Sequence, residues 1–230
     1  MYEQIQQEAY DANMQLPKLN LVLFTFGNVS AADRSKGVFA IKPSGVPYEE
    51  LSPDKMVIVD FEGKIIQGKL RPSSDTLTHA VLYKHWEHIS GIAHTHSTYA
   101  TAWAQSQLDI PIYGTTHADY NTVDIPCALP MSDEMIKGDY EKETGHQILN
   151  CFKERNLDYR EVEMVLIGNH APFTWGKIAD KAVHNSAVLE LLAKMALLTK
   201  QINPNAPTLK EALKQKHYER KHGANKYYGQ

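Results

Sequence analysis

Residues 89–96 read Ile-Ser-Gly-Ile-Ala-His-Thr-His, and this stretch sets the interpretation of the whole chain. The apolar run that ends at Ala93 is typical of a buried strand. Residues i and i+2 of a strand point to the same face, so a strand would hold the side chains of His94 and His96 next to each other. Two adjacent imidazoles can chelate one metal ion. In a chain with 11 histidines such a pair also arises by chance, so the pair alone does not decide whether the protein binds a metal.

His170 is the best candidate for a third ligand, because it comes just after the strand-like run Val165–Ile167. Binding residues collect where loops leave a sheet. Three histidines with one open position are the usual pattern of a catalytic rather than a structural zinc. Asp75 is a candidate fourth ligand or nearby base. An aspartate at this place also fits the start of a helix, where the dipole favours negative charge.

Three short segments share the chemistry of an anion site, because each offers small residues, hydroxyls or backbone amides. Lys42 adds a positive charge, and Ser73 and Ser74 open a predicted helix, where free amide hydrogens favour an anion. None matches a P-loop or a dinucleotide-binding pattern, and each alone is an ordinary turn unless the fold brings them together. The candidate phosphate-binding residues are Gly27, Asn28, Lys42, Ser44, Gly45, Ser73 and Ser74.

Strand-like and helix-like patterns are interspersed along the chain, which predicts an α/β or α+β class with helices covering a sheet. Ser73 or Ser74 would cap one helix, and Thr-Leu-Lys-Glu at 208–211 is a capping box that opens the last one. No repeat or linker interrupts the pattern, so residues 1–230 are expected to form one domain. Helices are predicted at 3–16, 75–87, 132–153, 178–201 and from 208 to the region of Gly223, strands at 21–26, 38–41, 56–59, 64–67, 89–96 and 162–167, and a turn at 28–30.

The composition is that of an ordinary globular domain, with 43% hydrophobic and 22% charged residues. A net charge of -3 argues against a protein that binds nucleic acid through bulk charge. No run approaches the ~20 apolar residues of a membrane span, and the acidic, polar N-terminus is unlike a signal peptide. Cys127 and Cys151 form neither a disulfide framework nor a CxxC site, so a reducing, cytoplasmic location is expected.

As a set, the motifs resemble one known family, the bacterial L-ribulose-5-phosphate 4-epimerases. The similarity runs from the first predicted helix to the last residue and is far more specific than any single motif. Broader relatives are the class II aldolases that act on fuculose phosphate and rhamnulose phosphate, and the adducin-like domains. The resemblance is carried by TFGNVSAAD at 25–33, IKPSGV at 41–46, RPSSDT at 71–76, HTHS at 94–97, GTTHADY at 114–120, the segment 168–175 and KHYERKHGANKYYGQ at 216–230.

The resemblance implies a three-layer αβα fold, in which a mainly antiparallel sheet lies between helical layers, and a homotetramer. It implies one zinc per subunit, held by His94, His96 and His170 with Asp75 nearby, although histidine ligands accept other divalent ions. It also implies that six of the candidate residues named above bind the phosphate of a pentulose phosphate, namely Asn28, Lys42, Ser44, Gly45, Ser73 and Ser74.

Asp119 and Tyr228 are the acid/base pair that the resemblance implies, and the tyrosine would act in the site of a neighbouring subunit. His217 and Arg220 lie on the face of the last helix that accompanies Tyr228. His217 is a candidate for assisting proton transfer and Arg220 for holding substrate charge. The same two side chains also fit a solvated basic helix face.

The reaction implied is the interconversion of L-ribulose 5-phosphate and D-xylulose 5-phosphate through cleavage and re-formation of the C3–C4 bond. The C4 proton is not next to the C2 carbonyl, so its removal is unassisted, whereas the electrons of the C3–C4 bond can be delocalised onto that carbonyl. A class II aldolase would use the same sites and release both fragments, and an adducin-like module would not be catalytic. The basic C-terminal segment favours the epimerase, the three histidines disfavour the module, and the lack of an HExxH motif disfavours a zinc hydrolase. Arabinose and ascorbate breakdown remain alternative pathways for this reaction.

Overall fold

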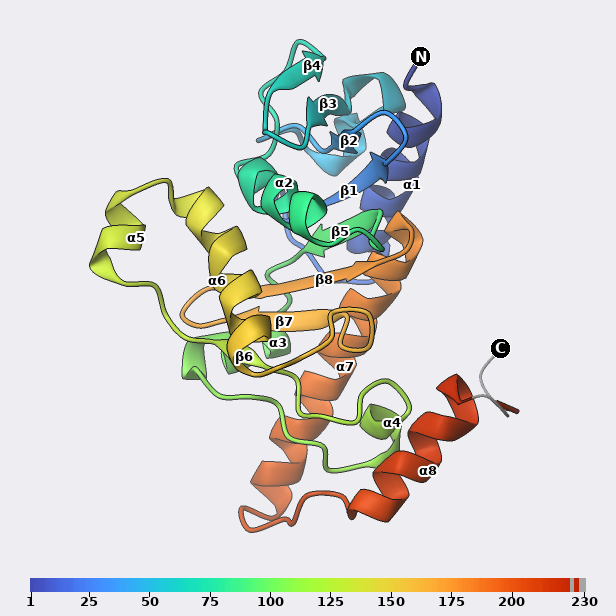
Figure 1. Cartoon of the computed structure of the whole chain (residues 1–230), viewed down its shortest axis with the longest axis vertical. Helices are drawn as coiled ribbons and strands as arrows, with labels where there is room; N and C mark the ends of the chain where they lie inside the picture. The colour runs from blue at the N-terminus through green and yellow to red at the C-terminus, as the bar shows by residue number, and fades with distance from the viewer. Residues whose placement is uncertain (224–225, 228–230) are drawn as a thin grey trace.

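A central sheet of eight strands organises the computed structural model, which describes residues 1–223 and 226–227 (Figure 1). The strand order is β4-β3-β2-β1-β5-β8-β7-β6. All neighbouring strands are antiparallel except β6 and β7, which are parallel. The mainly antiparallel sheet that was expected is therefore confirmed. The strands are β1 (Asn28–Asp33), β2 (Val38–Ile41), β3 (Val57–Asp60), β4 (Ile65–Gln67), β5 (Gly91–His94), β6 (Cys127–Ala128), β7 (Met164–Ile167) and β8 (Pro172–Gly176).

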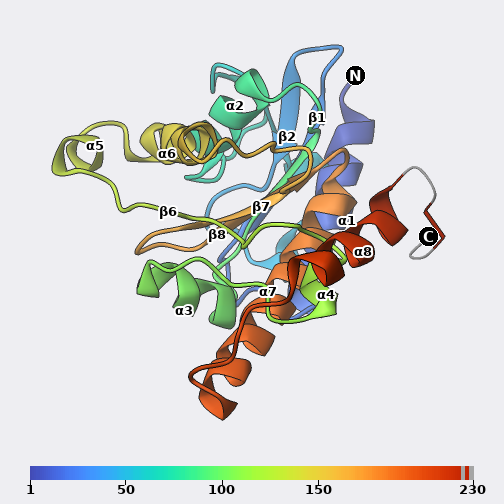
Figure 2. The same cartoon turned by 60° about the horizontal axis from the view of Figure 1, so that its bottom comes forward.

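Helices cover both faces of the sheet, which confirms the expected three-layer arrangement (Figure 2). One face packs against α2 (Thr76–His85) and α6 (Tyr140–Glu154), and the other packs against α1 (Glu3–Lys18), α3 (Thr98–Ser106) and α7 (Ala179–Ile202). No helix in the described part of the chain is both long enough and apolar enough to cross a membrane. The shorter elements are η1 (Tyr48–Glu50), η2 (Pro53–Lys55), α4 (Thr115–Ala118), α5 (Asp133–Lys137) and α8 (Glu211–His222).

The alternation of side chains along the central strands separates the two cores. Ile92 on β5 joins the core under α2 and α6, whereas its neighbour Ala93 joins the core under α1 and α7. On β1, Val29 and Ala31 pack towards α1, so the intervening Ser30 faces α2. There its hydroxyl contacts His79 and Tyr83, each at 2.7 Å. The polar side chain of Ser30 therefore lies on the face of the sheet that α2 covers.

The strand predicted at 21–26 and the turn predicted at 28–30 are both wrong. Residues 28–33 form β1, which pairs with β2 on one side and β5 on the other. The apolar run before it is a loop in which Leu23, Phe24 and Phe26 are 69%, 82% and 55% exposed. An apolar run can be predicted as a strand even when no neighbouring strand pairs with it. The strand β1 was missed because its polar side chains do not give an apolar strand pattern, although it is paired on both edges.

Other boundaries also differ from the prediction. The helix expected at 132–153 is two helices, α5 and α6, because the chain turns at Gly138. The strand expected at 89–96 ends at His94, and β6, β8, α3 and α4 were not predicted.

Both expected helix caps are absent. Asp75, rather than Ser73 or Ser74, takes the N-cap position of α2 and makes no side-chain capping bond. The last helix begins at Glu211, with Lys210 at its N-cap, so the capping box at 208–211 does not form. In the structure the amide of Leu209 instead donates to the carbonyl of Ile112, at 2.8 Å, which takes this segment out of the capping geometry.

Candidate active site

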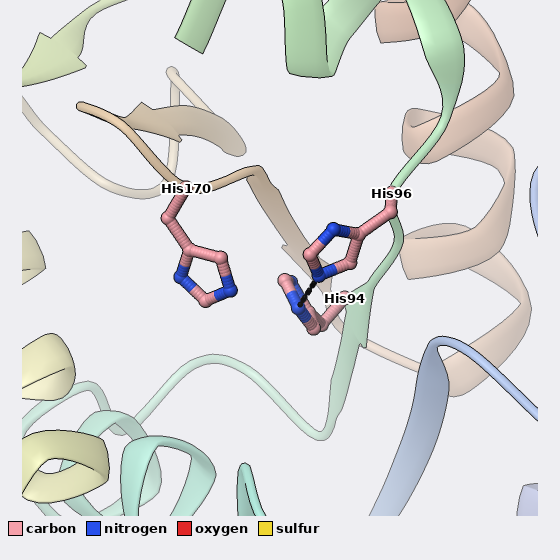
Figure 3. Close-up of side chains that lie close together, drawn as sticks. All are labelled: His94, His96 and His170. Carbon is pink, nitrogen blue, oxygen red and sulfur yellow. Dashed lines mark hydrogen bonds between the residues drawn. The ribbon is translucent and has the colours of Figure 1, made fainter. Parts of the chain in front are cut away.

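Three imidazoles converge at one end of β5. His94 is the last residue of the strand, His96 lies two residues beyond it, and His170 lies in the connection between β7 and β8 (Figure 3). The Nε2 atoms of His94 and His96 are 3.1 Å apart, and the candidate ligand atoms of all three lie within 4.8 Å of one another. The structure therefore brings together the three histidines that were singled out in the sequence.

The surroundings of these rings fit a bound divalent metal. Nδ1 of His94 donates to the carbonyl of Pro172 at 2.9 Å, which leaves Nε2 for an ion, and such a second contact is typical of metal-binding histidines. Nδ1 of His170 is buried and has no hydrogen-bond partner among the described residues. Burial lowers the pKa of His96 and of His170 to about 4, so both rings are neutral and able to ligate near pH 7.

A tight turn delivers His170 to this position. Asn169 adopts φ of 64°, a left-handed conformation that asparagine tolerates better than most residues. A side chain at Gly168 would come within 2.8 Å of the Ala128 carbonyl oxygen, so only glycine allows the turn to pack so closely. The amide of Ile167 donates to the carbonyl of Ala171 at 3.1 Å and closes the turn.

Asp75 lies beside the histidines. Its Oδ2 is 4.0 Å from Nε2 of His94, and it accepts a hydrogen bond of 2.6 Å from Nδ2 of Asn28. Burial by itself would raise the pKa of Asp75, but His94, His79 and the Asn28 bond outweigh it and hold the pKa below its usual value. The carboxylate is therefore ionised next to the three nitrogens, where it can ligate or act as a base.

All the candidate phosphate-binding segments open onto the same cavity as the histidines. Its volume is about 450 Å³. Lys42 is only 2% exposed, and its Nζ donates to the Thr25 carbonyl at 3.2 Å. Gly45 has φ of 70°, which turns the backbone after Ser44. The cavity is lined by Thr25, Phe26, Gly27, Asn28, Lys42, Pro43, Ser44, Gly45, Ser73, Ser74, Asp75, His94, His96, Tyr140, Glu141 and His170.

Four of these residues were missed in the sequence. Thr25 and Phe26 come from the loop that was mistaken for a strand, and the Phe26 ring centroid is 6.3 Å from that of His96. Tyr140 and Glu141 come from the start of α6, and the Tyr140 ring is 6.2 Å from His170. Their position depends on the break between α5 and α6, which the prediction of one continuous helix concealed.

A second polar cluster centres on Asp119, the residue that follows α4. Arg220 of α8 donates to both carboxylate oxygens, each at 3.0 Å, and Nδ1 of His217 lies 3.0 Å from Oδ1. His222 contacts the Asp119 carbonyl at 2.9 Å. Burial alone would raise the pKa of Asp119, but Arg220 and His217 outweigh it and keep the carboxyl ionised. The structure thus joins three of the residues that were expected to act together.

The Asp119 cluster and the histidine cavity are separate within one chain. None of Asp119, His217 and Arg220 lines the cavity. Figures 1 and 2 both place α4 and α8 at the end of the molecule away from α6, whose first residues line the cavity. Tyr228 lies outside the described residues. A site that used both groups of residues would therefore need them from two different chains.

Comparisons with known proteins agree with this architecture. Residues 7–197 match the family model described as Class II Aldolase and Adducin N-terminal domain. The chain is 48% identical over 228 residues to L-ribulose-5-phosphate 4-epimerase UlaF of Salmonella paratyphi A, with 99% of each chain covered. It is 49% identical to the protein of the same name from Salmonella paratyphi C, again with 99% of each chain covered. Among solved structures, an L-fuculose 1-phosphate aldolase superposes with a TM-score of 0.77 at 23% identity, covering 94% of this chain and 95% of that one, which is a likeness of fold.

Proposed function

This chain belongs to the class II aldolase and adducin family, and from that premise we propose that it is a metal-dependent L-ribulose-5-phosphate 4-epimerase. It interconverts L-ribulose 5-phosphate and D-xylulose 5-phosphate. The observation that carries the proposal is that a single cavity holds both kinds of group. The three convergent histidines line it together with the buried Lys42 and two short segments of small residues, 44–45 and 73–74. A phosphorylated keto sugar needs a metal site and an anion site within a single space.

Zinc is the proposed ion, one per subunit, because three histidine nitrogens with an open position are its usual catalytic ligands, although other divalent ions accept the same donors. When bound, the ion supplies Lewis-acid stabilisation of the negative charge that develops on the C2 and C3 oxygens of the substrate. His94, His96 and His170 hold it. Asp75, 4.0 Å from His94, serves as a fourth ligand or as a base beside it.

The phosphate group is proposed to bind at the other side of the cavity. Ser73 and Ser74 precede α2, where their hydroxyls and the positive end of the helix dipole favour an anion. Lys42 supplies the positive charge, while Ser44 and Gly45 offer a hydroxyl and a turned backbone. Gly27 and Asn28 close the remaining side. This grip retains the glycolaldehyde phosphate fragment while its aldehyde group rotates, which separates an epimerase from an aldolase.

The C4 oxygen loses a proton when the C3–C4 bond breaks and regains one when the bond forms on the opposite face. Asp119 and Tyr228 are the proposed base and acid on the two faces, with His217 assisting and Arg220 holding negative charge. Because the Asp119 cluster does not line the cavity of its own chain, we propose that these residues act in a neighbouring subunit of a homotetramer. The whole chain, residues 1–230, is proposed to act as one domain in the cytoplasm, on a pentulose phosphate and with no nucleic acid or membrane partner.

The proposal is tested by incubating zinc-loaded enzyme with L-ribulose 5-phosphate and identifying the product by proton NMR. D-xylulose 5-phosphate is expected, and its formation should stop when a chelator removes the metal. Free glycolaldehyde phosphate as the main product would instead identify an aldolase. Unchanged substrate in the presence of zinc would exclude this substrate and favour a non-catalytic, adducin-like role.

Substrate binding should weaken as the pH rises through about 8. Burial lowers the pKa of Lys42 to about 8, so its ammonium is charged below that pH and progressively neutral above it. We expect KM to rise ~10-fold per pH unit above the pKa, since the phosphate then meets an uncharged amine. Steady-state kinetics between pH 6.5 and 9.5 would measure this.

The variant Lys42→Met tests whether Lys42 causes this pH dependence of KM. Its KM should be high and nearly independent of pH, whereas Lys69→Met, at an exposed lysine, should follow the unaltered enzyme. A pH dependence of KM that persists in Lys42→Met would show that another group is responsible.

Two inactive variants should restore activity when they assemble together. Asp119→Asn damages one group of residues and His96→Ala the other, so co-expressed chains would form sites in which both groups are intact. If the groups come from different chains that mix at random, about a quarter of the sites are complete. Activity of the tagged, doubly purified hybrid is the measurement.

The matched control pairs His96→Ala with His170→Ala, which damage the same group and should restore nothing. If the Asp119→Asn and His96→Ala hybrid also stays inactive, while native mass spectrometry shows that it is mixed, the shared site is contradicted.

A further inference from the structure

Tyr48 is the first residue of the short helix η1, and it is buried beside the phosphate side of the histidine cavity. Its ring centroid lies 5.0 Å from Nζ of Lys42. Its hydroxyl donates to the carbonyl of Phe26 at 2.8 Å and makes a longer contact, of 3.3 Å, with the carbonyl of Gly27. Lys42, Phe26 and Gly27 all line the cavity, whereas Tyr48 does not. A residue outside the cavity therefore contacts two of the segments that form its wall.

The ammonium group of Lys42 is buried without an opposite charge beside it. Its Nζ donates to the Thr25 carbonyl at 3.2 Å and lies 3.5 Å from the Pro43 carbonyl, and it pairs with no carboxylate of the described residues. A buried ammonium without such a partner is costly, but the negative face of an aromatic ring attracts a cation within about 6 Å. The Tyr48 ring therefore favours the charged form of Lys42 and holds it at the cavity wall.

The loop before β1 is held at its carbonyl groups by the same two side chains. The carbonyl of Thr25 accepts from Lys42, and those of Phe26 and Gly27 accept from Tyr48. In a trans peptide the N–H points away from the C=O, so the bond from Tyr48 to the Phe26 carbonyl also sets the direction of the Gly27 amide. That amide has no hydrogen-bond partner among the described residues. The Tyr48 hydroxyl thus orients a hydrogen-bond donor of the cavity wall.

We propose that Tyr48 is a positioning residue for the phosphate group of the substrate. Its ring holds the Lys42 ammonium, and its hydroxyl holds the loop 25–27, so that a positive charge and the Gly27 amide are presented to one anion. The inference rests on the proposed function, because it identifies what shapes the phosphate side of that site. Tyr48 acts through Lys42 and the loop and does not touch the substrate itself.

Sulfate binding tests this role independently of catalysis, because sulfate keeps the same charge between pH 6.5 and 9.5. Burial lowers the pKa of Lys42 to about 8, so the affinity for sulfate, measured by calorimetry, should fall above that pH. Burial raises the pKa of Tyr48 far above its ordinary value, so its phenol stays neutral in this range. The variant Lys42→Met should bind sulfate weakly at every pH. The other ionisable groups near Lys42 are Asp75, His94, His96, Tyr140, Glu141 and His170 in the cavity and the exposed Glu49, Glu50 and Arg71 on the adjoining segments.

Two changes at position 48 separate the hydroxyl from the ring. Tyr48→Phe removes only the hydroxyl, so sulfate affinity below pH 8 should fall ~5- to 10-fold while the midpoint of the pH dependence stays near 8. A trifluorinated phenylalanine at the same position keeps the shape of the ring but removes its negative face. Its midpoint should lie ~1 pH unit below that of Tyr48→Phe, because the charged form of Lys42 is then less favoured.

Tyr83 provides the matched control. It is also buried, its hydroxyl contacts Ser30 at 2.7 Å, and the Arg34 guanidinium lies 5.4 Å from its ring centroid. Tyr83→Phe removes a comparable hydroxyl that contacts neither Lys42 nor the loop 25–27. Both the affinity for sulfate and the midpoint should therefore match those of the unaltered protein.

Equal midpoints for the fluorinated and unfluorinated rings would overturn the inference, and so would a Tyr48→Phe affinity equal to that of Tyr83→Phe. Either result in a protein that converts L-ribulose 5-phosphate would leave the proposed function standing. The expected changes in a protein that leaves this sugar phosphate unaltered would support the role of Tyr48 at the anion site and contradict the proposed epimerase activity.

Discussion

Replacing His170 with alanine should lower kcat/KM for L-ribulose 5-phosphate by ~1000-fold or more, because Lewis-acid stabilisation contributes several kcal/mol to such a reaction. The ring lies in a turn that Gly168 and Asn169 shape, and its candidate ligand atom is within 4.8 Å of those of His94 and His96. Removing one of three neutral donors leaves a weaker site. Zinc content and initial rates of the purified variant are the measurements.

The control for this loss is His88→Ala, which removes an exposed histidine outside the convergent group. It should keep full zinc content and full turnover. His170→Ala with a normal complement of zinc and near-normal rates would exclude His170 as a ligand. Excess zinc that restores the rate of the variant would show weakened affinity rather than a damaged fold.

Asp119→Asn should lower kcat by ~100- to 10,000-fold, the range associated with loss of a general acid or base. The amide keeps the shape of the carboxylate but cannot take up the proton of the C4 hydroxyl. Zinc content should be unchanged, because Asp119 does not line the histidine cavity of its own chain. A kcat effect without loss of metal separates this role from that of the histidines, and steady-state kinetics with metal analysis would measure both.

A change of charge and the loss of an ion pair accompany this substitution, so a matched variant is needed. Asp109 pairs with Arg155 at 2.6 Å, much as Asp119 pairs with Arg220 at 3.0 Å. Asp109→Asn should therefore disturb a comparable pair while leaving kcat within ~3-fold, since exposed pairs contribute little to stability. Near-normal turnover of Asp119→Asn would remove this residue from the mechanism.

Much of the metal site was predictable from the sequence because its signal is local. Two histidines two residues apart after an apolar run, and a third after a second strand, identify the histidine group, although His96 lies beyond the end of β5. The segments around Lys42 and Ser73 were recognisable for the same reason, since turn chemistry is written in adjacent residues. The sheet type and the three layers also agree with the prediction.

The parts that were missed depend on long-range contacts. Whether 21–26 or 28–33 becomes a strand is decided by pairing with β2 and β5, which no local pattern records. Tyr140 and Glu141 line the cavity only because the chain turns at Gly138. The separation of Asp119 from the histidines follows from the positions of α4 and α8, and the sequence carries no signal for it.

The most direct test of the account is the epimerisation of L-ribulose 5-phosphate by the zinc-loaded enzyme in deuterium oxide, followed by NMR. Cleavage and re-formation of the C3–C4 bond never breaks the C4–H bond, so the D-xylulose 5-phosphate formed should carry no deuterium at C4. Product that carries deuterium at C4 would mean that the proton is removed and replaced, and it would contradict the bond-cleavage mechanism on which the roles of the histidines, Lys42 and Asp119 are based.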